Sequence, residues 1–592
     1  MFGGLVNLVQ SQTVGPPPKN VPPPTPIRLP QCNPQLPDLS DGEYQSSLVR
    51  FLQQLHRPAE LNESHFAALG VHVHADAPAE EVVPDSAYLP PSSEWDGMSL
   101  EDVQRKDENF RRNLRHGGRS PEARTYLERR IELSIANQAA FRTVRRIKPE
   151  PGKLPPRLGN CYEFFKQMEL MCAFWEDTSL PPLSSDSQEE PPPLPPRPAD
   201  ASSEQPVTGA APESNTRSES NSEAKSKEPE RVTYRTTPGS QMPAEFRHNF
   251  ITAFIKLVAW DFGCNVNPPR VEPRLQLLSP PDQKTSKSKA PPTPQVASYF
   301  PSGCVFLCQM PTTREAARAG TIYGPIGAVS ARNTTNFSTP ADGNIDFGRE
   351  LVAALITAQH RTREGQPEKR FGEGKWWATE KRWGGGEGGP IGREVDGDSI
   401  VGDKDAGPGD SSSEGQSDTA QKPGPVSPSS SQDSKSKPVL PIPMRGQPAS
   451  KKPRKNLSIY DSYRMVRLPT TNWDKKTKYQ AIGKKRGAGY DDVFVLSSLF
   501  HHLCVLRVRV PDRLLDVLNG APEPTEGDGK GRSWGKLEMW RSKWFDLFIV
   551  EERLEAMRVL WGVLTWAMRA EDADAEKEKE KIGGGDVAMK DA

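Results

Sequence analysis

Residues 490–518 read YDDVFVLSSLFHHLCVLRVRVPDRLLDVL, a stretch in which the apolar pattern changes from strand-like to helical. Residues 506–510 alternate apolar and basic side chains, as a half-exposed strand does. Residues 511–518 predict a short helix that ends at the turn signal Asn519-Gly520. Strand and helix are therefore both expected at this point of the chain.

Residues 533–569 carry the strongest helical pattern in the chain, because large apolar residues recur mostly three or four positions apart. Glu551 interrupts this stripe, so the pattern fits either one helix or two. The region is also rich in tryptophan, and we favour core positions for these side chains over an exposed groove for a partner. The apolar stripe and the remaining tryptophans are Leu537, Trp540, Trp544, Leu547, Leu554, Trp561, Leu564, Trp534 and Trp566.

Helical spacing recurs towards the N-terminus, in residues 43–70, 99–147, 158–177, 243–262 and 346–361. Within residues 99–147, Gly117-Gly118 predicts a turn between two antiparallel helices. Strand signals are short and confined to residues 297–337, 457–470 and 506–510. The predicted fold class is therefore mainly α with a small β component (α+β), with a discontinuous core interrupted by long disordered linkers.

Composition supports the linkers, because the 592 residues include 60 Pro and 47 Gly and the mean hydropathy is −0.69. Polar segments of this kind bury too little apolar area to offset chain entropy. The predicted disordered segments are 1–40, which is Pro-rich, the linkers 178–240 and 362–455, and the charged tail 570–592. The predicted folded parts are a helical region at 43–177, a helix with a small β region at 243–361, and a mixed C-terminal region at 457–569.

Charge and cysteine content exclude several classes of protein. Lys plus Arg equals Asp plus Glu at 77 each, so the whole chain has no general attraction to nucleic acid or to an anionic membrane. The seven cysteines are scattered and odd in number, which is typical of a reducing compartment rather than of a disulfide framework. We also see no secretory signal and no apolar run long enough to span a membrane, so we expect an intracellular protein without a membrane partner.

A basic cluster in the last predicted linker indicates nuclear localisation. Lys451, Lys452, Arg454 and Lys455 flank a proline, and import receptors bind extended basic segments of this kind. The alternative is a basic run that is merely solvated. We favour the nuclear import signal, because the cluster lies beside a stretch that we expect to be disordered and accessible.

Two further basic clusters follow, and they raise the hypothesis of direct nucleic-acid binding through residues 451–486. Trp473 and Tyr479 lie among them and could stack on bases. The candidate nucleic-acid contacts are Lys475, Lys476, Lys478, Lys484, Lys485 and Arg486.

Ile147-Lys148-Pro149-Glu150 matches the acceptor pattern of the small ubiquitin-like modifier, in which an aliphatic residue precedes the lysine and an acid follows two positions later. Pro149 keeps the segment extended, which suits attack by Lys148. The alternative is the basic C-terminal end of a helix, which such residues also stabilise.

A proline-rich motif, Pro-Pro-Leu-Pro-Pro-Arg-Pro, contains Pro192, Pro195 and Arg197. In a polyproline II helix the two prolines fill aromatic grooves of a binding domain and the arginine meets an acidic pocket. Two interpretations fit the motif equally well: a ligand for such a domain, and a stiff, solvated spacer.

No pattern in the chain predicts a catalytic, metal or cofactor site. His72 and His74 alternate as ligands on a strand do, but no further His and carboxylate motif follows, so we favour a loop or a surface strand. His501-His502 sits in an apolar run. We therefore expect no enzyme activity, no metal and no cofactor.

The function that fits these features is a nuclear, non-enzymatic interaction protein, an accessory subunit of a chromatin or transcription regulatory assembly. Its partners are expected to be proteins of a nuclear complex. The alternatives are a nucleic-acid-binding protein acting through residues 451–486 and a cytoplasmic adaptor that uses proline-rich motifs. The sequence leaves open the oligomeric state and whether the folded parts form one domain or several.

Overall fold

The described residues of the computed structural model fall mainly within three parts of the chain, 47–181, 231–365 and 478–570. The described residues are 21–30, 47–95, 98–115, 117–148, 152, 154–181, 231–267, 273–281, 297–311, 313–319, 321–332, 334–335, 337–365, 478–523 and 532–570.

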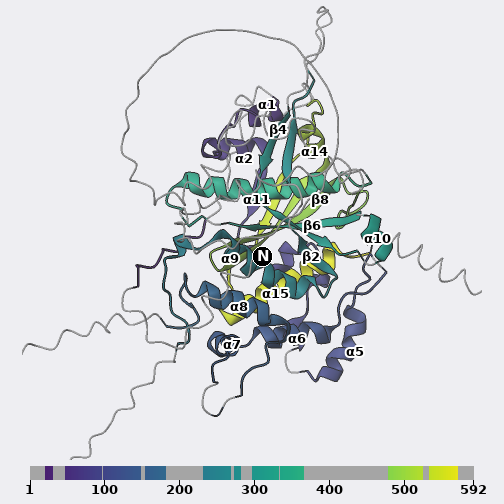
Figure 1. Ribbon diagram of the computed structural model, residues 1–592. Coiled ribbons are helices and arrows are strands. Elements are labelled where there is room, and N and C mark those ends of the chain that lie inside the picture. Colours follow the sequence, from purple (N-terminus) through teal and green to yellow (C-terminus); the bar gives the residue numbers. More distant parts are fainter. Residues whose placement is uncertain are drawn as a thin grey trace, which may run out of the picture. The chain divides into compact units, whose positions relative to one another are not determined.

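A mixed sheet of nine strands forms the centre of the described part (Figure 1). Its order is β1-β10-β9-β8-β6-β5-β2, while β11 pairs with β9 and β7 pairs with β6. The strands are β1 (Val71–His74), β2 (Cys264–Asn267), β5 (Val305–Gln309), β6 (Thr321–Ala331), β7 (Lys478–Gln480), β8 (Tyr490–Leu499), β9 (His502–Pro511), β10 (Leu537–Arg541) and β11 (Phe545–Asp546).

The sheet joins parts of the chain that lie far apart in sequence. β8 and β9 form an antiparallel hairpin at its centre, and β8 also pairs in parallel with β6. At one edge, β1 pairs in parallel with β10. Residues 71–74, 264–267, 305–331 and 478–546 therefore contribute strands to one sheet. The three folded parts expected from the sequence are joined in this sheet.

Helices cover both faces of this sheet. In Figure 1, α11 (Pro340–Arg361) crosses one face, with α1 (Leu48–Leu52), α2 (Glu63–Leu69) and α14 (Asp512–Leu518) on the same side. The opposite face carries α8 (Tyr162–Met171), α9 (Ala244–Ala259) and α15 (Val550–Ala567). The remaining elements are α3 (Ala79–Val82), α4 (Ser92–Trp95), α5 (Leu100–Phe110), α6 (Ala123–Leu133), α7 (Asn137–Val144), α10 (Arg314–Ala319), β3 (Arg274–Leu278) and β4 (Ala297–Pro301).

The alternation of side chains in β8 explains this three-layer arrangement. Val493 and Val495 are buried in the cluster that includes α11, whereas Phe494 and Leu496 are buried in the cluster that includes α15. A strand that is covered on both faces carries a nearly continuous run of apolar residues. Each face of the sheet consequently belongs to a separate hydrophobic core.

Helix α15 packs closely against the N-terminal part of the chain. A Cβ atom added at Gly562 would lie 2.6 Å from a methyl carbon of Leu89, so a larger residue here would have to displace that side chain. Trp561 and Trp566 of the same helix are buried, as is Trp534. The expected core position is confirmed for these three side chains, while Trp540 and Trp544 are half-buried.

The predicted fold class was wrong, because a large mixed sheet, not a helical core, organises the described residues. Two physical features concealed the sheet. Almost every residue of the central strand β8 is buried, so the strand lacks the alternation of buried apolar and exposed polar residues that marks a half-exposed strand. The parallel pair β6–β8 also joins residues more than 150 positions apart, which no local pattern reports.

Strand β10 corrects the predicted helix over residues 533–569. Leu537, Trp540 and Trp544 satisfy helical spacing, but Leu537 and Met539 also alternate with Glu538 and Trp540 as a strand does. Pairing with β9 and β1 on its two sides decides for the strand. The helix begins only at Val550 and is single.

The region of residues 99–147 contains three helices, α5, α6 and α7, instead of the predicted two. The predicted turn after the first helix is present, with Gly117 at φ +79°.

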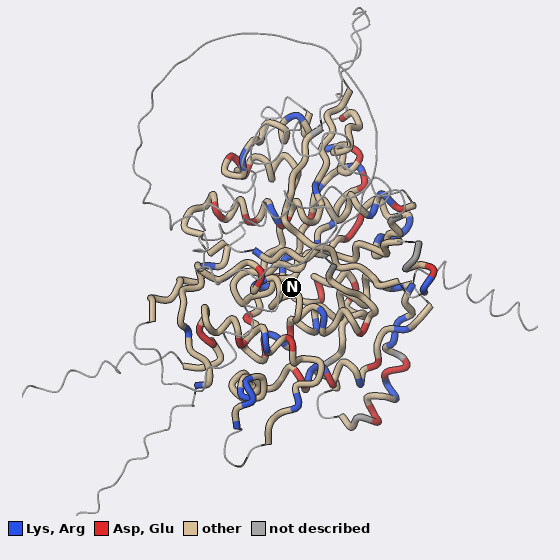
Figure 2. The backbone as a smooth tube through the Cα atoms, viewed as in Figure 1, with Lys and Arg blue, Asp and Glu red and all other residues tan. Residues whose placement is uncertain are grey.

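Figure 2 shows acidic and basic residues interspersed along α5. Among the residues that the structure describes, no helix combines the length and apolar character that crossing a bilayer requires.

Candidate functional site

The two ends of the long segment 366–477 meet at one place on the folded core. The amide of Gly365, just after α11, donates a hydrogen bond of 2.8 Å to the carbonyl oxygen of Tyr479. Tyr479 lies in β7, which pairs in parallel with the start of β6. We call this junction the neck, defined by residues 360–365 and 478–484.

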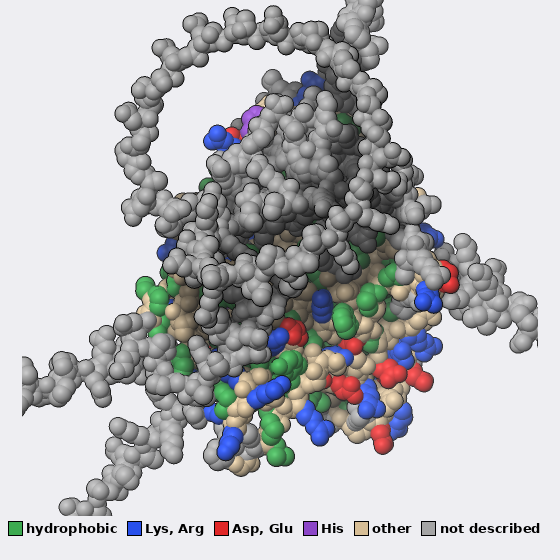
Figure 3. Space-filling model, viewed as in Figure 1, with side chains coloured by type: hydrophobic (Ala, Val, Ile, Leu, Met, Phe, Trp, Pro, Cys, Tyr) green, Lys and Arg blue, Asp and Glu red, His purple; other side chains and the backbone are tan. Residues whose placement is uncertain are grey.

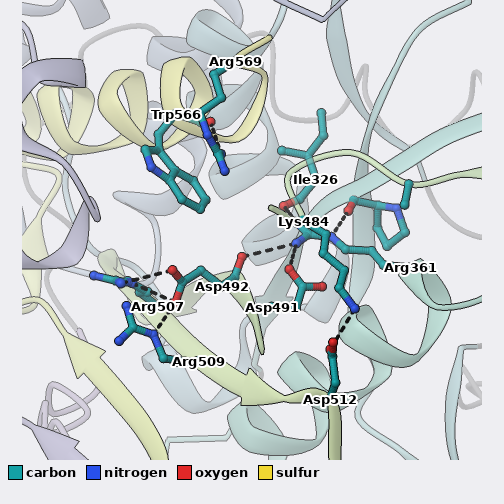
Figure 4. A network of polar contacts seen from close by, with 12 residues as sticks. Ile326, Arg361, Lys484, Asp491, Asp492, Arg507, Arg509, Asp512, Trp566 and Arg569 are labelled. Carbon is teal, nitrogen blue, oxygen red and sulfur yellow. Dashed lines mark hydrogen bonds and ion pairs between the residues drawn. The ribbon is translucent and has the colours of Figure 1, made fainter. Parts of the chain in front are cut away.

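Arg361 is the central side chain of the neck (Figure 4). Its guanidinium donates to Asp491 Oδ1 at 2.7 Å and to the carbonyl oxygen of Pro325, also at 2.7 Å. It also donates to the carbonyl oxygens of Asp492, at 3.2 Å, and Ile326, at 2.5 Å. The end of α11 is thereby bonded to β6 and β8 at once.

This ion pair is entirely buried, since the side chains of Arg361 and Asp491 are 0% and 1% exposed. Burial raises the pKa of Asp491, and the charge of Arg361 opposes that rise. A buried charge that loses its partner is strongly destabilising. The neck therefore depends on both members of the pair.

The neighbouring acid, Asp492, makes a second pair on the opposite face of β8. Its carboxylate accepts from Arg507 at 3.1 Å and from Arg509 at 3.2 Å. The guanidinium of Arg507 lies 4.2 Å from the ring centre of Trp540, which is a favourable cation–π distance. The consecutive acids thus bond to basic residues on both sides of the sheet, as Figure 4 shows.

His360 and Tyr479 close the neck with aromatic contacts. The His360 ring lies edge-on to Tyr479 at 5.4 Å and to Phe306 at 5.0 Å. Neither ring nitrogen of His360 finds a hydrogen-bond partner among the described residues. Burial, assisted by the charge of Arg363, lowers the pKa of His360 to about 3.

The depressed pKa of His360 predicts an acid-sensitive neck. The unfolded chain takes up a proton at this histidine below pH ~6.5, whereas the folded chain does not until about pH 3. The contribution of neutral His360 to the free energy of unfolding is therefore fully present above about pH 6.5, and it is lost as the pH falls from about 6.5 towards 3. Between pH 7.5 and pH 5, we expect His360 alone to remove about 2 kcal/mol from the free energy of unfolding.

His360→Leu should flatten this part of the pH dependence, because leucine fills a similar volume and cannot titrate. Chemical denaturation of both proteins at pH 7.5 and pH 5 measures the difference. Equal losses of stability in the variant and the parent protein would rule out His360 as a source of acid sensitivity.

The segment 182–230 also begins and ends at residues in contact. Arg231 donates through its guanidinium to the carbonyl oxygen of Pro181. Val232 then donates to the side-chain oxygen of Gln138 at 2.7 Å, which fixes the returning chain beside α7. Two long segments thus start and finish at closed junctions on one core.

Part of the predicted basic segment lies at the neck. Lys484 pairs with Asp512 at 2.7 Å, while Lys485 and Arg486 are exposed. A side chain at Gly483 would contact the guanidinium of Arg361, and its φ of +95° also requires glycine, so this turn is fixed in place. The backbone of Lys478 belongs to β7, and Lys475 and Lys476 lie outside the described residues.

Tyr479 is not available for the expected stacking on bases, because it is 4% exposed and covered by His360 and Arg363. Lys148, the candidate modifier acceptor, is exposed after the end of α7. The import signal (Lys451, Lys452, Arg454 and Lys455), the proline motif (Pro192, Pro195 and Arg197) and Trp473 lie outside the described residues.

A buried charge cluster under α11 was missed by the sequence analysis. Glu350 Oε1 lies 3.2 Å from Arg332 Nη2 and 3.6 Å from Arg541 Nη2, and it accepts from the Ser497 hydroxyl at 2.5 Å. Asp346 also pairs with Arg332, and burial raises the pKa of its carboxyl. Two acids and two guanidinium groups balance in charge, so the arrangement suits joining α11 to the sheet.

One cluster of described residues has the composition of a metal site, and it also escaped the sequence analysis. It consists of His501 and His502 at the tip of the β8–β9 hairpin and Asp546 in β11. The signal was a His-His pair between two strands. His72 and His74, which the sequence analysis considered, lie instead in β1, where His74 stacks on Trp540 at 5.1 Å.

Comparison with known proteins identifies no relative of this chain. No family model matches it, and the searches of curated proteins and of solved structures found no match either. Function therefore has to be proposed from the contacts described above.

Proposed function

We propose that this protein is a nuclear, non-enzymatic interaction protein whose folded core holds both ends of long segments that carry short recognition motifs. Its partners would be proteins of a nuclear regulatory assembly. The hydrogen bond between Gly365 and Tyr479 carries this proposal, because it places the beginning and the end of the 366–477 segment together. The predicted import signal at residues 451–455 lies within that segment.

The junction explains how so long a segment is compatible with a stable core. The cost of closing a flexible loop grows only with the logarithm of its length, by about 0.6 kcal/mol for each doubling. A segment of roughly 110 residues is therefore tolerated if the neck supplies enough contacts. The buried pair of Arg361 and Asp491 and the edge-on contact between the rings of His360 and Tyr479 provide them.

The cysteines support a role that does not depend on a reactive thiol. Six of the seven lie among the described residues, and all six are buried. Burial raises the pKa of Cys504 to about 11 and that of Cys308 to about 12, so these thiols stay protonated at neutral pH.

Replacing residues 372–470 with a Gly-Ser linker of about 12 residues tests the proposal. The core should keep its fold, and the shorter loop should stabilise it by at most about 2 kcal/mol. Nuclear accumulation of a fluorescent fusion should be lost. Thermal melting and microscopy measure the two effects on the same variant.

Two controls separate the segment from its signal. Replacing residues 185–227 with the same linker should leave nuclear accumulation unchanged. Alanine at Lys451, Lys452, Arg454 and Lys455 in the full chain should abolish accumulation as fully as the deletion does. Nuclear signal that survives both the deletion and the alanine variant would refute the proposed address, and a deletion variant that fails to fold would refute the closed neck.

Direct nucleic-acid binding is the second candidate, favoured by the exposed pair Lys485 and Arg486, which directly follow the neck. On the face shown in Figure 3, however, basic and acidic side chains are interspersed rather than separated. Binding would have to come from the local cluster. Retention on duplex DNA that weakens with salt, and that is reduced by Lys485→Ser with Arg486→Ser, would select this alternative.

A further inference from the structure

The tip of the β8–β9 hairpin brings together three side chains that can bind a metal ion. Asp546 Oδ2 lies 3.3 Å from His501 Nε2 and 3.9 Å from His502 Nε2. One potential ligand atom from each of the three residues lies within 4.8 Å of the other two. The side chains of His501, His502 and Asp546 are only 0%, 11% and 9% exposed.

The 3.3 Å separation of His501 and Asp546 is close to the spacing of ligands around a shared cation, and the 3.9 Å separation of His502 and Asp546 is too long for a hydrogen bond. Around tetrahedral Zn²⁺, with bonds of about 2.0–2.1 Å, neighbouring ligand atoms lie about 3.4 Å apart. Nδ1 of the fully buried His501 ring has no hydrogen-bond partner among the described residues, and Nε2 faces the Asp546 carboxylate at 3.3 Å. Nε2 of His501 is therefore a potential metal ligand beside the carboxylate.

The surroundings of Asp546 leave a lone pair on one of its oxygens for a cation. Oδ1 accepts from the amide of Phe548 at 2.9 Å, and Oδ2 accepts from the hydroxyl of Thr178 at 2.6 Å. A carboxylate oxygen has two lone pairs, so Oδ2 keeps one after bonding to Thr178. The contact with Thr178 also fixes the orientation of the carboxylate, as the outer partners of metal ligands commonly do.

We propose that His501, His502 and Asp546 form a binding site for Zn²⁺. Two imidazoles and one carboxylate are ligands that this ion accepts, with a water in the fourth position. The ion would join the turn between β8 and β9 to β11 and, through Thr178, to the chain that follows α8. Such a site would stabilise the fold, since little of it is open to solvent.

The test uses the full chain without a histidine tag, treated with a chelator and then titrated with Zn²⁺ in a calorimeter. We expect one ion per chain and a higher melting temperature in its presence. Co²⁺ in place of Zn²⁺ should give the visible absorption of a four-coordinate site. Asp546→Asn and His502→Gln should each weaken binding by tenfold or more.

The matched control is His72→Gln with His74→Gln, which removes a histidine pair from β1 and should leave the affinity unchanged. Melting of the metal-free variants verifies that each has folded. The proposal is overturned if the parent chain binds no Zn²⁺, or if Asp546→Asn and His502→Gln, both folded, bind it as tightly as the control does.

Discussion

Arg361→Met should lower the free energy of unfolding by about 3 to 5 kcal/mol, because it leaves Asp491 as a buried charge without its partner. The carbonyl oxygens of Pro325, Ile326 and Asp492 would also lose a donor. Chemical denaturation followed by tryptophan fluorescence measures the loss. The midpoint should move while the variant remains folded in buffer.

A second variant distinguishes the pair from a general sensitivity of the core. Arg361→Met combined with Asp491→Leu removes both charges, and replacing a buried ion pair with apolar side chains is often nearly neutral. We expect the double variant to recover much of the lost stability. Arg314→Met, at an exposed position in α10, should change stability by less than about 0.5 kcal/mol. A double variant as unstable as the single one would show that Arg361 does not act through Asp491.

Arg553→Met should be destabilising to a similar degree, by about 3 kcal/mol or more. The guanidinium is fully buried and donates at 2.6 Å to each of three acceptors: the carbonyl oxygens of Leu133 and Ile135 and the side-chain oxygen of Asn137. Each acceptor left unsatisfied inside a protein costs about 1–3 kcal/mol. The variant should loosen the contact of α15 with α6 and α7.

The control for this prediction lies in the same helix. Arg558 is partly exposed and bonds to Glu80 at 2.9 Å and to the carbonyl oxygen of Pro90 at 3.0 Å. Surface pairs of this kind contribute little, so Arg558→Met should cost at most about 1 kcal/mol. Equal costs for Arg553→Met and Arg558→Met would contradict the role that we assign to the buried arginine.

Much of the helical structure could be predicted from the sequence. The spacing over residues 243–262 and 346–361 locates α9 and most of α11. The true start of α11 has its own signal, since Thr339 and Asp342 form a capping box around Pro340. The sheet was underestimated for the opposite reason, because β8 is buried on both faces and its parallel neighbour β6 is distant in sequence.

The candidate sites were harder to predict than the fold. In the sequence, Arg361 follows a helical stripe and resembles any solvated basic residue at a helix end. Only the fold shows that it is bonded to β6 and β8. Asp491-Asp492 at the head of an apolar run was a usable signal, because acids there need buried partners. The convergence of His501 and His502 on Asp546 depends on β11 pairing with β9, which the helical interpretation of that region excluded.

The neck joins strands that come from both sides of the 366–477 segment. Residues before and after the 366–477 segment meet in the parallel β6–β7 and β6–β8 pairs, and Arg361 bonds to both β6 and β8. A core closed in this way does not depend on the segment for its fold, which is what the proposed display of recognition motifs requires.

Cutting the chain inside that segment tests this claim most directly. A specific protease site introduced near Ser430 would divide the protein into one piece that contains β1 to β6 and another that contains β7 to β11. We predict that the two pieces remain together in a 1:1 complex on size-exclusion chromatography in native buffer, and that they separate only in denaturant. Separation or aggregation of the pieces in native buffer would contradict a single sheet built from both sides of the segment.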